Sequence, residues 1–422
     1  MGQHATHSQY FVYFCSTLSM KILFLTDNFP PEFNAPATRT FEHCRYWVRQ
    51  GAEVTVITCF PNFPKGKVFD GYKNKWKQVE YIDGIRVIRV WSYITANAGF
   101  IKRTVDFLSF AATSFLAGLS VKCDVIIATS PQFFTAVSGC MLGFFKRRPW
   151  IMEVRDLWPE SIKAVEAINS NGLISMLEKV ELFLYRNARK VIVVTDSFKD
   201  NLTDRGIPAE KIHVVKNGVD LSVFQPIPKN IALAKELKLE NKLVFGYVGT
   251  HGLAHGLDFI VRSIQKVNDD RIHFLFIGDG AEKANTVALA TQLGLQNITF
   301  LEPVAKSEIQ SYLSIVDVAL VPLKKSPTFQ SVIPSKVFES VAMNIPILLG
   351  VDGEIRSIIE RYKAGLYFEP ESEVEFLARL YEMTDLLSRD RNHFVDACQR
   401  MASDFDRRNL ATRMLEVVKA EA

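Results

Sequence analysis

The sequence predicts an α/β protein of two doubly wound domains, each a parallel sheet with helices on both faces. From Lys21 onward, short apolar runs typical of buried strands alternate with helical patterns. This alternation occurs twice, before and after a proline-containing stretch at 211–228. The length of 422 residues also exceeds one ordinary hydrophobic core.

The expected strands follow directly from the apolar runs. In the first half they are 21–26, 53–59, 85–90, 124–130, 150–154 and 190–195. In the second half they are 243–249, 273–278, 298–302, 316–322 and 345–350. Between the halves a strand enters an Asn-Gly turn at Asn217, and two prolines stiffen the linker that follows.

The composition is that of a well-packed globular protein, with 48% hydrophobic and 23% charged residues. A net charge of +4 is too small to indicate nucleic acid as a partner. The six cysteines are scattered without a C-x-x-C pair, which favours a reduced, cytoplasmic compartment.

Residues 1–19 are interpreted as an N-terminal extension, either disordered or left by cloning or an upstream start. The segment lacks the basic region and the long apolar run of a signal peptide. We divide the rest into a first domain, 20–224, a second domain, 225–393, and a terminal helical segment, 394–422, without a strand partner.

The segment 322–346 is the strongest indication of a binding site. It runs from an apolar strand through a polar loop into a short helix. Pro334 and Ser335 fit the first turn, with Ser335 as an N-cap, so free backbone N–H groups would point into the loop. Lys336 then lies where the helix dipole disfavours a cation, which a bound phosphate would explain. Glu339 lies one turn further, where its carboxylate could accept two hydrogen bonds from a ribose diol. These features favour a nucleotide, and two solvated surface side chains are the alternative.

The same segment resembles the C-terminal signature of glycosyltransferase family 4, which carries two glutamates eight positions apart. Here the second is Glu339, whereas the first position is Ser331. The S-x-x-P-S-K-x-x-E form is similar to the N-acetyl-L-fucosamine transferases of bacterial O-antigen and capsule assembly. The phrase N-G-V-D-x-x-x-F at 217–224 resembles the family's crossing between domains. The resemblance implies the GT-B fold, in which two Rossmann-like domains face an interdomain cleft. It also implies that the terminal segment 394–422 crosses back onto the first domain.

In such a fold the second domain would bind a nucleotide sugar. The glycine-rich turn 249–258 would let the backbone approach the diphosphate. The family places an arginine and a lysine hereabouts, but this sequence has Thr250 and His255, so Lys336 would carry more of the positive charge. Val304 would shape the base pocket through main-chain contacts. The implied donor-binding residues are Gly249, Thr250, His255, Val304, Ser331, Pro334, Ser335, Lys336 and Glu339.

Asp156, in the polar segment 153–161 after a first-domain strand, is a catalytic candidate together with Lys336. Many family members have a histidine there that contacts the donor sugar. Asp156 could hold a sugar hydroxyl or stabilise positive charge on the anomeric carbon. A structural ion pair with Arg155 is the alternative.

The acceptor is expected on the first domain. By resemblance the loop after the first strand lies under the acceptor, with Asn28, Pro31 and Glu32 as candidates, and a plain surface loop is the alternative. The lysine-rich segment 65–77 could dock on anionic lipid, although a solvated loop explains it almost as well. Residues 100–150 contain six Lys/Arg and two Asp, which gives a local charge of +4. The apolar runs in the same stretch are too short or too charged to span a bilayer.

The resemblance therefore implies a retaining, metal-independent glycosyltransferase with a UDP-sugar donor and a polyprenyl-diphosphate-linked saccharide acceptor. It would lie in the cytoplasm, peripheral on the inner face of the plasma membrane. We expect no metal cofactor, because the one Asp-x-Asp triplet, Asp404 to Asp406, falls in the helical tail. A sugar-nucleotide epimerase of the same architecture and a catalytically silent nucleotide-sugar-binding protein remain alternatives.

Overall fold

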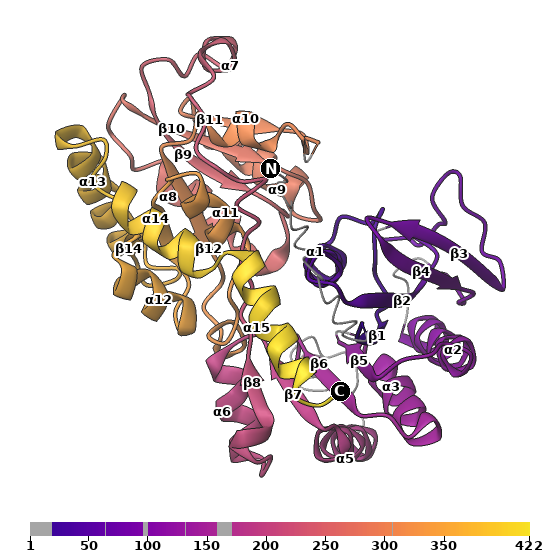
Figure 1. Ribbon diagram of the computed structural model, residues 1–422. Coiled ribbons are helices and arrows are strands. Elements are labelled where there is room, and N and C mark those ends of the chain that lie inside the picture. Colours follow the sequence, from indigo (N-terminus) through magenta and orange to yellow (C-terminus); the bar gives the residue numbers. More distant parts are fainter. Residues whose placement is uncertain (1–18, 64, 96–99, 131, 158–170, 306) are drawn as a thin grey trace, which may run out of the picture.

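The computed structural model describes residues 19–63, 65–95, 100–130, 132–157, 171–305 and 307–422. The predicted extension lies almost entirely outside these residues, as does 158–161 of the polar segment that contains Asp156. The chain forms two domains, each built on its own sheet (Figure 1). The predicted architecture of two doubly wound α/β domains is confirmed.

The first sheet has the strand order β3-β4-β2-β1-β5-β6-β7-β8. Its strands are β1 (Lys21–Leu25), β2 (Glu53–Cys59), β3 (Lys77–Ile82), β4 (Ile85–Val90), β5 (Val125–Thr129), β6 (Trp150–Val154), β7 (Lys190–Val193) and β8 (Ile212–Val214). All neighbours pair in parallel except β3, which runs antiparallel to β4 at the sheet edge. The apolar runs become strands because both faces of a parallel sheet are covered by helices.

The described helices of this domain follow its strands. They are α1 (Ala35–Arg49), α2 (Phe100–Leu119), α3 (Phe133–Lys146), α5 (Asn171–Asn187), α6 (Asp196–Asp204) and the short η1 (Ala209–Lys211). α1 begins at Asn34, whose side chain accepts a hydrogen bond from the Ala37 amide at 2.9 Å.

The second sheet has the order β11-β10-β9-β12-β13-β14, and its neighbours all pair in parallel. Its strands are β9 (Leu243–Val248), β10 (Ile272–Ile277), β11 (Ile298–Leu301), β12 (Val318–Pro322), β13 (Ile347–Gly350) and β14 (Gly365–Tyr367). Its helices are α7 (Ile231–Glu236), η2 (Leu253–His255), α8 (Leu257–Ile264), α9 (Lys283–Gln292), α10 (Ile309–Leu313), η3 (Pro327–Phe329), α11 (Lys336–Ala342), α12 (Glu354–Tyr362) and α13 (Glu373–Arg389).

The terminal segment divides between the two domains (Figure 1). α14 (Val395–Asp404) packs its buried side chains, Cys398 and Met401 among them, into the core of the second domain. α15 (Arg407–Lys419) packs against α1 instead, where the indole nitrogen of Trp47 donates to the Ala411 carbonyl at 2.8 Å. Only α15 therefore returns to the first domain.

The chain crosses between the domains twice, and the two crossings are hydrogen-bonded to each other. The Val219 amide donates to the Phe405 carbonyl at 3.1 Å, and the Arg407 amide donates to the Val219 carbonyl at 2.8 Å. A side chain at Gly218 would collide with the Phe405 carbonyl oxygen. The glycine of the predicted Asn-Gly turn is thus needed for this close approach.

Candidate active site

The loop after β9 and the first turn of α11 meet at the carboxyl edge of the second sheet, where open α/β sheets bind their ligands. A Cβ added to Gly249 would lie 3.0 Å from the Lys336 ammonium nitrogen. Gly249 also has a φ of +144°, which side-chain-bearing residues rarely adopt. The structure thus brings together two of the predicted donor residues.

The ammonium of Lys336 is the most unusual group at this edge. Its nitrogen is buried, donates no hydrogen bond to any described residue, and lies 3.8 Å from the centroid of the Tyr247 ring. Burial lowers the pKa of Lys336 to about 7, and the nearby carboxylate of Glu339 opposes that shift. A buried cation without a hydrogen-bonded anion is what a phosphate site would offer before its ligand arrives.

Two histidines flank the same tyrosine. The ring centroids of His251 and His255 lie 5.5 and 5.9 Å from that of Tyr247. Burial lowers the pKa of both histidines, that of His255 to about 4. At neutral pH both rings are therefore uncharged. The glycine-rich turn thus supplies no positive charge through these histidines.

The first turn of α11 differs from the prediction in one respect. Ser335 is at the N-cap position of α11, as predicted, but it has helical dihedral angles (φ −60°, ψ −29°) and its exposed side chain makes no capping hydrogen bond. The Val337 amide instead donates to the Pro334 carbonyl at 3.2 Å, which tightens the first turn. Ser331 precedes this turn, and its hydroxyl donates to the Thr328 carbonyl at 3.4 Å.

Glu339 lies one turn after Lys336, as the spacing predicts. Burial lowers the pKa of Lys336 and that of Arg407 at the domain crossing, and the Glu339 carboxylate opposes both shifts. The remaining donor candidates are peripheral. Thr250 is exposed and its carbonyl accepts the Tyr247 hydroxyl at 2.5 Å, whereas Val304, after β11, packs half-buried on the second core.

In the first domain, Asp156 follows β6. Its side chain reaches solvent, yet the surrounding protein desolvates the carboxyl enough to raise its pKa, and Arg155 opposes that shift. Two guanidinium nitrogens of Arg155 are buried without hydrogen-bond partners among the described residues. Asp156 and Lys336 thus lie at the strand ends of different domains.

The acceptor candidates make mostly internal contacts. The Asn28 side-chain oxygen accepts from the Asn34 side chain at 2.7 Å. Pro31 follows a cis peptide bond. Glu32 is buried, and one of its carboxylate oxygens accepts the backbone amides of residues 62 and 63 at 2.7 and 2.8 Å. Glu32 therefore holds a neighbouring loop in place.

Sequence reasoning missed Asp27, whose pKa is raised to about 8 by burial and by the nearby carboxylates.

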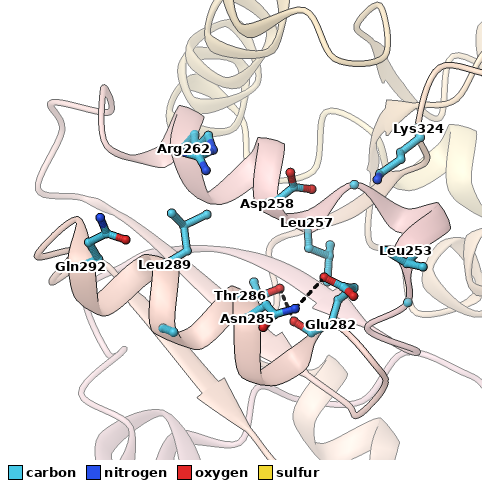
Figure 2. Close-up of a pocket in the computed structure, with 13 residues that line it drawn as sticks. Leu253, Leu257, Asp258, Arg262, Glu282, Asn285, Thr286, Leu289, Gln292 and Lys324 are labelled. Atoms are coloured by element: carbon cyan, nitrogen blue, oxygen red, sulfur yellow. Dashed lines mark hydrogen bonds between the residues drawn. The ribbon is translucent and has the colours of Figure 1, made fainter.

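A larger cavity in the second domain than the space around Lys336 lies elsewhere. A groove of about 340 Å³ runs between α8 and α9, and Figure 2 shows the side chains that line it. In it the Asn285 side chain donates to the Glu282 carboxylate at 3.1 Å. None of the predicted donor residues lines this groove. Lys336 and Glu339 instead line a small space of about 20 Å³, with room for about one water molecule. The candidate site is therefore marked by the contacts around Lys336 and not by the size of a cavity.

Residues 37–223 match the family description Glycosyltransferase Family 4, and residues 229–398 match Glycosyl transferases group 1. WcaI of Escherichia coli (strain K12), which carries the name of a colanic acid biosynthesis glycosyl transferase, is 26% identical over 365 residues, 84% of this chain and 89% of WcaI. WbjE of Pseudomonas aeruginosa, named as a glycosyltransferase, is 24% identical over 281 residues, 65% of this chain and 70% of WbjE.

Solved structures share the fold. Sucrose-phosphate synthase from Thermosynechococcus elongatus superposes with a TM-score of 0.75 at 15% identity, covering 95% of this chain and 98% of that one. Anabaena HepE in complex with UDP-glucose gives a TM-score of 0.70 at 16% identity, covering 95% and 100%. The two family matches together span most of both domains, and the chain is a member of glycosyltransferase family 4 with the GT-B fold.

Proposed function

We propose that this protein is a retaining glycosyltransferase of bacterial surface polysaccharide biosynthesis. It moves a sugar from a UDP-sugar to a polyprenyl-diphosphate-linked saccharide. The donor is UDP-N-acetyl-L-fucosamine or another UDP-N-acetylhexosamine. The observation that carries the proposal is the buried Lys336 ammonium, unpaired among the described residues, at the first residue of α11. An anionic diphosphate supplies the partner that this cation lacks.

The relatives support a role in polysaccharide biosynthesis and a UDP-sugar as the donor. WcaI is named for the biosynthesis of a polysaccharide, colanic acid, and HepE was solved with UDP-glucose bound. We propose retention of anomeric configuration because the family resemblance implies it. The N-acetyl-L-fucosamine donor is proposed because the S-x-x-P-S-K-x-x-E form at 331–339 is similar to that of the N-acetyl-L-fucosamine transferases.

Each side chain then has a task. Lys336 and the backbone N–H groups at the start of α11 stabilise the leaving diphosphate electrostatically. Glu339 binds the ribose diol. Asp156 approaches the donor sugar from the first domain when the two domains close, and closure excludes the water that would hydrolyse the donor.

We propose that the reaction needs no divalent metal. The one Asp-x-Asp triplet is used structurally: Asp404 accepts the Tyr362 hydroxyl at 2.5 Å, and Asp406 accepts the Arg408 amide at the start of α15. Both carboxylates therefore stabilise the terminal helices.

A lipid-linked acceptor places the enzyme at the inner face of the plasma membrane, and α2 and α3 provide a surface for it. None of the described helices combines the length and apolar content needed to cross a bilayer. Both helices nevertheless expose apolar side chains, namely Val105, Leu108, Leu116, Leu119, Met141, Phe144 and Phe145. Exposed basic residues Lys102, Arg103, Arg147 and Arg148 adjoin them, a combination that suits anionic headgroups. These exposed residues are the α2–α3 surface.

The test is sugar transfer to a synthetic polyprenyl-diphosphate-linked N-acetylhexosamine from a panel of UDP-sugars, with EDTA present. We expect product only with a matching donor. Glu339→Ala should weaken UDP binding by about tenfold, and Lys336→Ala should lower turnover more than binding. Lys235→Ala, an exposed lysine on α7, is the matched control and should leave both unchanged.

Three results would contradict the proposal in distinguishable ways. Conversion of donor without acceptor indicates an epimerase. UDP binding without any transfer indicates a silent binding protein. Full activity in both Glu339→Ala and Lys336→Ala removes the site assignment.

A further inference from the structure

Tyr247 on β9 lies beneath the ammonium of Lys336 and is fixed in place. Its side chain is fully buried, and its hydroxyl donates to the Thr250 carbonyl in the glycine-rich turn. The ring therefore cannot turn away without breaking this partly buried hydrogen bond. Gly249 lacks the side chain that would press on the ammonium from the adjoining position.

The other groups around this ammonium supply little compensating charge. His251 and His255 lie in the turn after β9. Both nitrogens of His251 and the Nδ1 of His255 are buried without a hydrogen-bond partner among the described residues. Burial lowers the pKa of both rings. Lys283 on α9 adds a positive charge that further lowers the pKa of His251. Glu339 on α11 is the carboxylate that acts on the pKa of Lys336.

We propose that Tyr247 is a positioning residue that holds Lys336 as an incomplete cation site, and that binding of the donor diphosphate completes this site with uptake of one proton by the lysine. This inference rests on the proposed nucleotide-sugar function. An aromatic face stabilises a desolvated cation less than a hydrogen-bonded phosphate does.

The direction of proton movement follows from the geometry and the titration. Without ligand, the lysine is largely neutral at pH 8, because its pKa is about 7. A diphosphate beside the nitrogen favours the charged form, so the amine takes a proton from the buffer and becomes an ammonium. At pH 6 the lysine already carries that proton, and uptake disappears.

The experiment is isothermal titration calorimetry of the full chain with UDP in HEPES and in Tris, whose ionisation enthalpies differ. At pH 8 we expect the difference in heat between the buffers to correspond to uptake of close to one proton, ~0.9, per UDP. At pH 6 this uptake should be absent. UDP's own ionisation is the same for all variants, so Lys336→Met reports the lysine's share and should abolish the uptake.

Variants of Tyr247 test the positioning role. Tyr247→Phe keeps the ring and should keep both proton uptake and UDP affinity within about twofold, whereas Tyr247→Leu should lose about tenfold in affinity. Circular dichroism checks that Tyr247→Leu is folded. Should it unfold, the wild type and Lys336→Met still decide whether the lysine takes up a proton when UDP binds.

Failure of the inference and failure of the proposed function are separable. No UDP binding by the wild type would overturn the proposed UDP-sugar function. UDP binding with equal proton numbers in the wild type and Lys336→Met would overturn the inference alone. Equal UDP affinity in Tyr247→Leu and the wild type would remove the positioning role.

Discussion

At the scale of single residues, Lys336 should make the ligand-free protein less stable than it could be. The lysine keeps its proton up to about pH 10.5 in the unfolded chain but only up to about pH 7 in the folded one. The unfolded state thus binds more protons between these values, and stability should rise with pH across that window. Lys336→Met should remove this slope and stabilise the protein by on the order of 1–3 kcal/mol at pH 6.5, with a smaller gain at pH 9.

Thermal unfolding followed by circular dichroism at the two pH values measures this effect. Lys235→Met, on the exposed face of α7, should leave the unfolding temperature unchanged at both. A Lys336→Met variant that is less stable than the wild type at pH 6.5 would show that the ammonium has a compensating partner.

Sequence reasoning reached some of these residues and missed others for a physical reason. Lys336 and Glu339 could be found because a helix start fixes their relation through local spacing. Tyr247 could not, since within an apolar strand a tyrosine looks like a core residue. Glu32 was assigned to the acceptor edge, but its hydrogen bonds reach residues 62 and 63, a long-range contact that no local pattern shows.

At the scale of elements, the α2–α3 surface should bind anionic membranes. Replacing Phe144 and Phe145 together by serine removes two large exposed side chains from the end of α3, where Arg147 follows directly. We expect sedimentation with phosphatidylglycerol vesicles to fall at least about tenfold, since burying each ring in lipid contributes roughly 1.5–3 kcal/mol.

Val374→Ser on α13 is the matched control, because Val374 and Phe144 are each 79% exposed. This control should sediment like the wild type. Equal vesicle binding by the Phe144/Phe145 double variant would place the membrane contact elsewhere, for example on the lysine-rich segment 65–77.

The elements themselves were largely predictable. The long apolar strands were all expected, because a strand buried on both faces leaves a continuous apolar run. β3, which begins at the last residue of the lysine-rich segment, was not predicted. An edge strand with one solvated face carries polar residues such as Lys77 and Glu80, so it lacks a continuous apolar run. β14 has only three residues, Gly365–Tyr367, too few for any periodicity to register.

At the scale of the whole molecule, one carboxylate joins the two domains beyond their covalent crossings. Glu354, at the start of α12 in the second domain, accepts the amides of Asp196 and Ser197 at 3.0 and 2.9 Å. These amides belong to the first turn of α6 in the first domain, so Glu354 caps a helix of the other domain. The Lys216 ammonium lies 2.6 Å from the same carboxylate.

This contact should limit how far the domains can rotate about the crossing at 217–219. Glu354→Gln removes the charge that Lys216 and the helix N-terminus both favour, and Glu354→Ala removes the acceptor altogether. We expect Glu354→Ala to speed hydrogen exchange of the 195–199 amides by at least about tenfold, with Glu354→Gln intermediate. Glu360→Gln, which lies on the same helix and removes an ion pair with Arg356 one turn away, is the control. Hydrogen exchange reports only on the contact itself. Small-angle scattering of the same variants tells whether loss of the contact broadens the distribution of domain orientations. Faster exchange with unchanged scattering would mean that the hydrogen-bonded crossings at Val219 and Arg407 already fix the domains, and that Glu354 stabilises α6 alone.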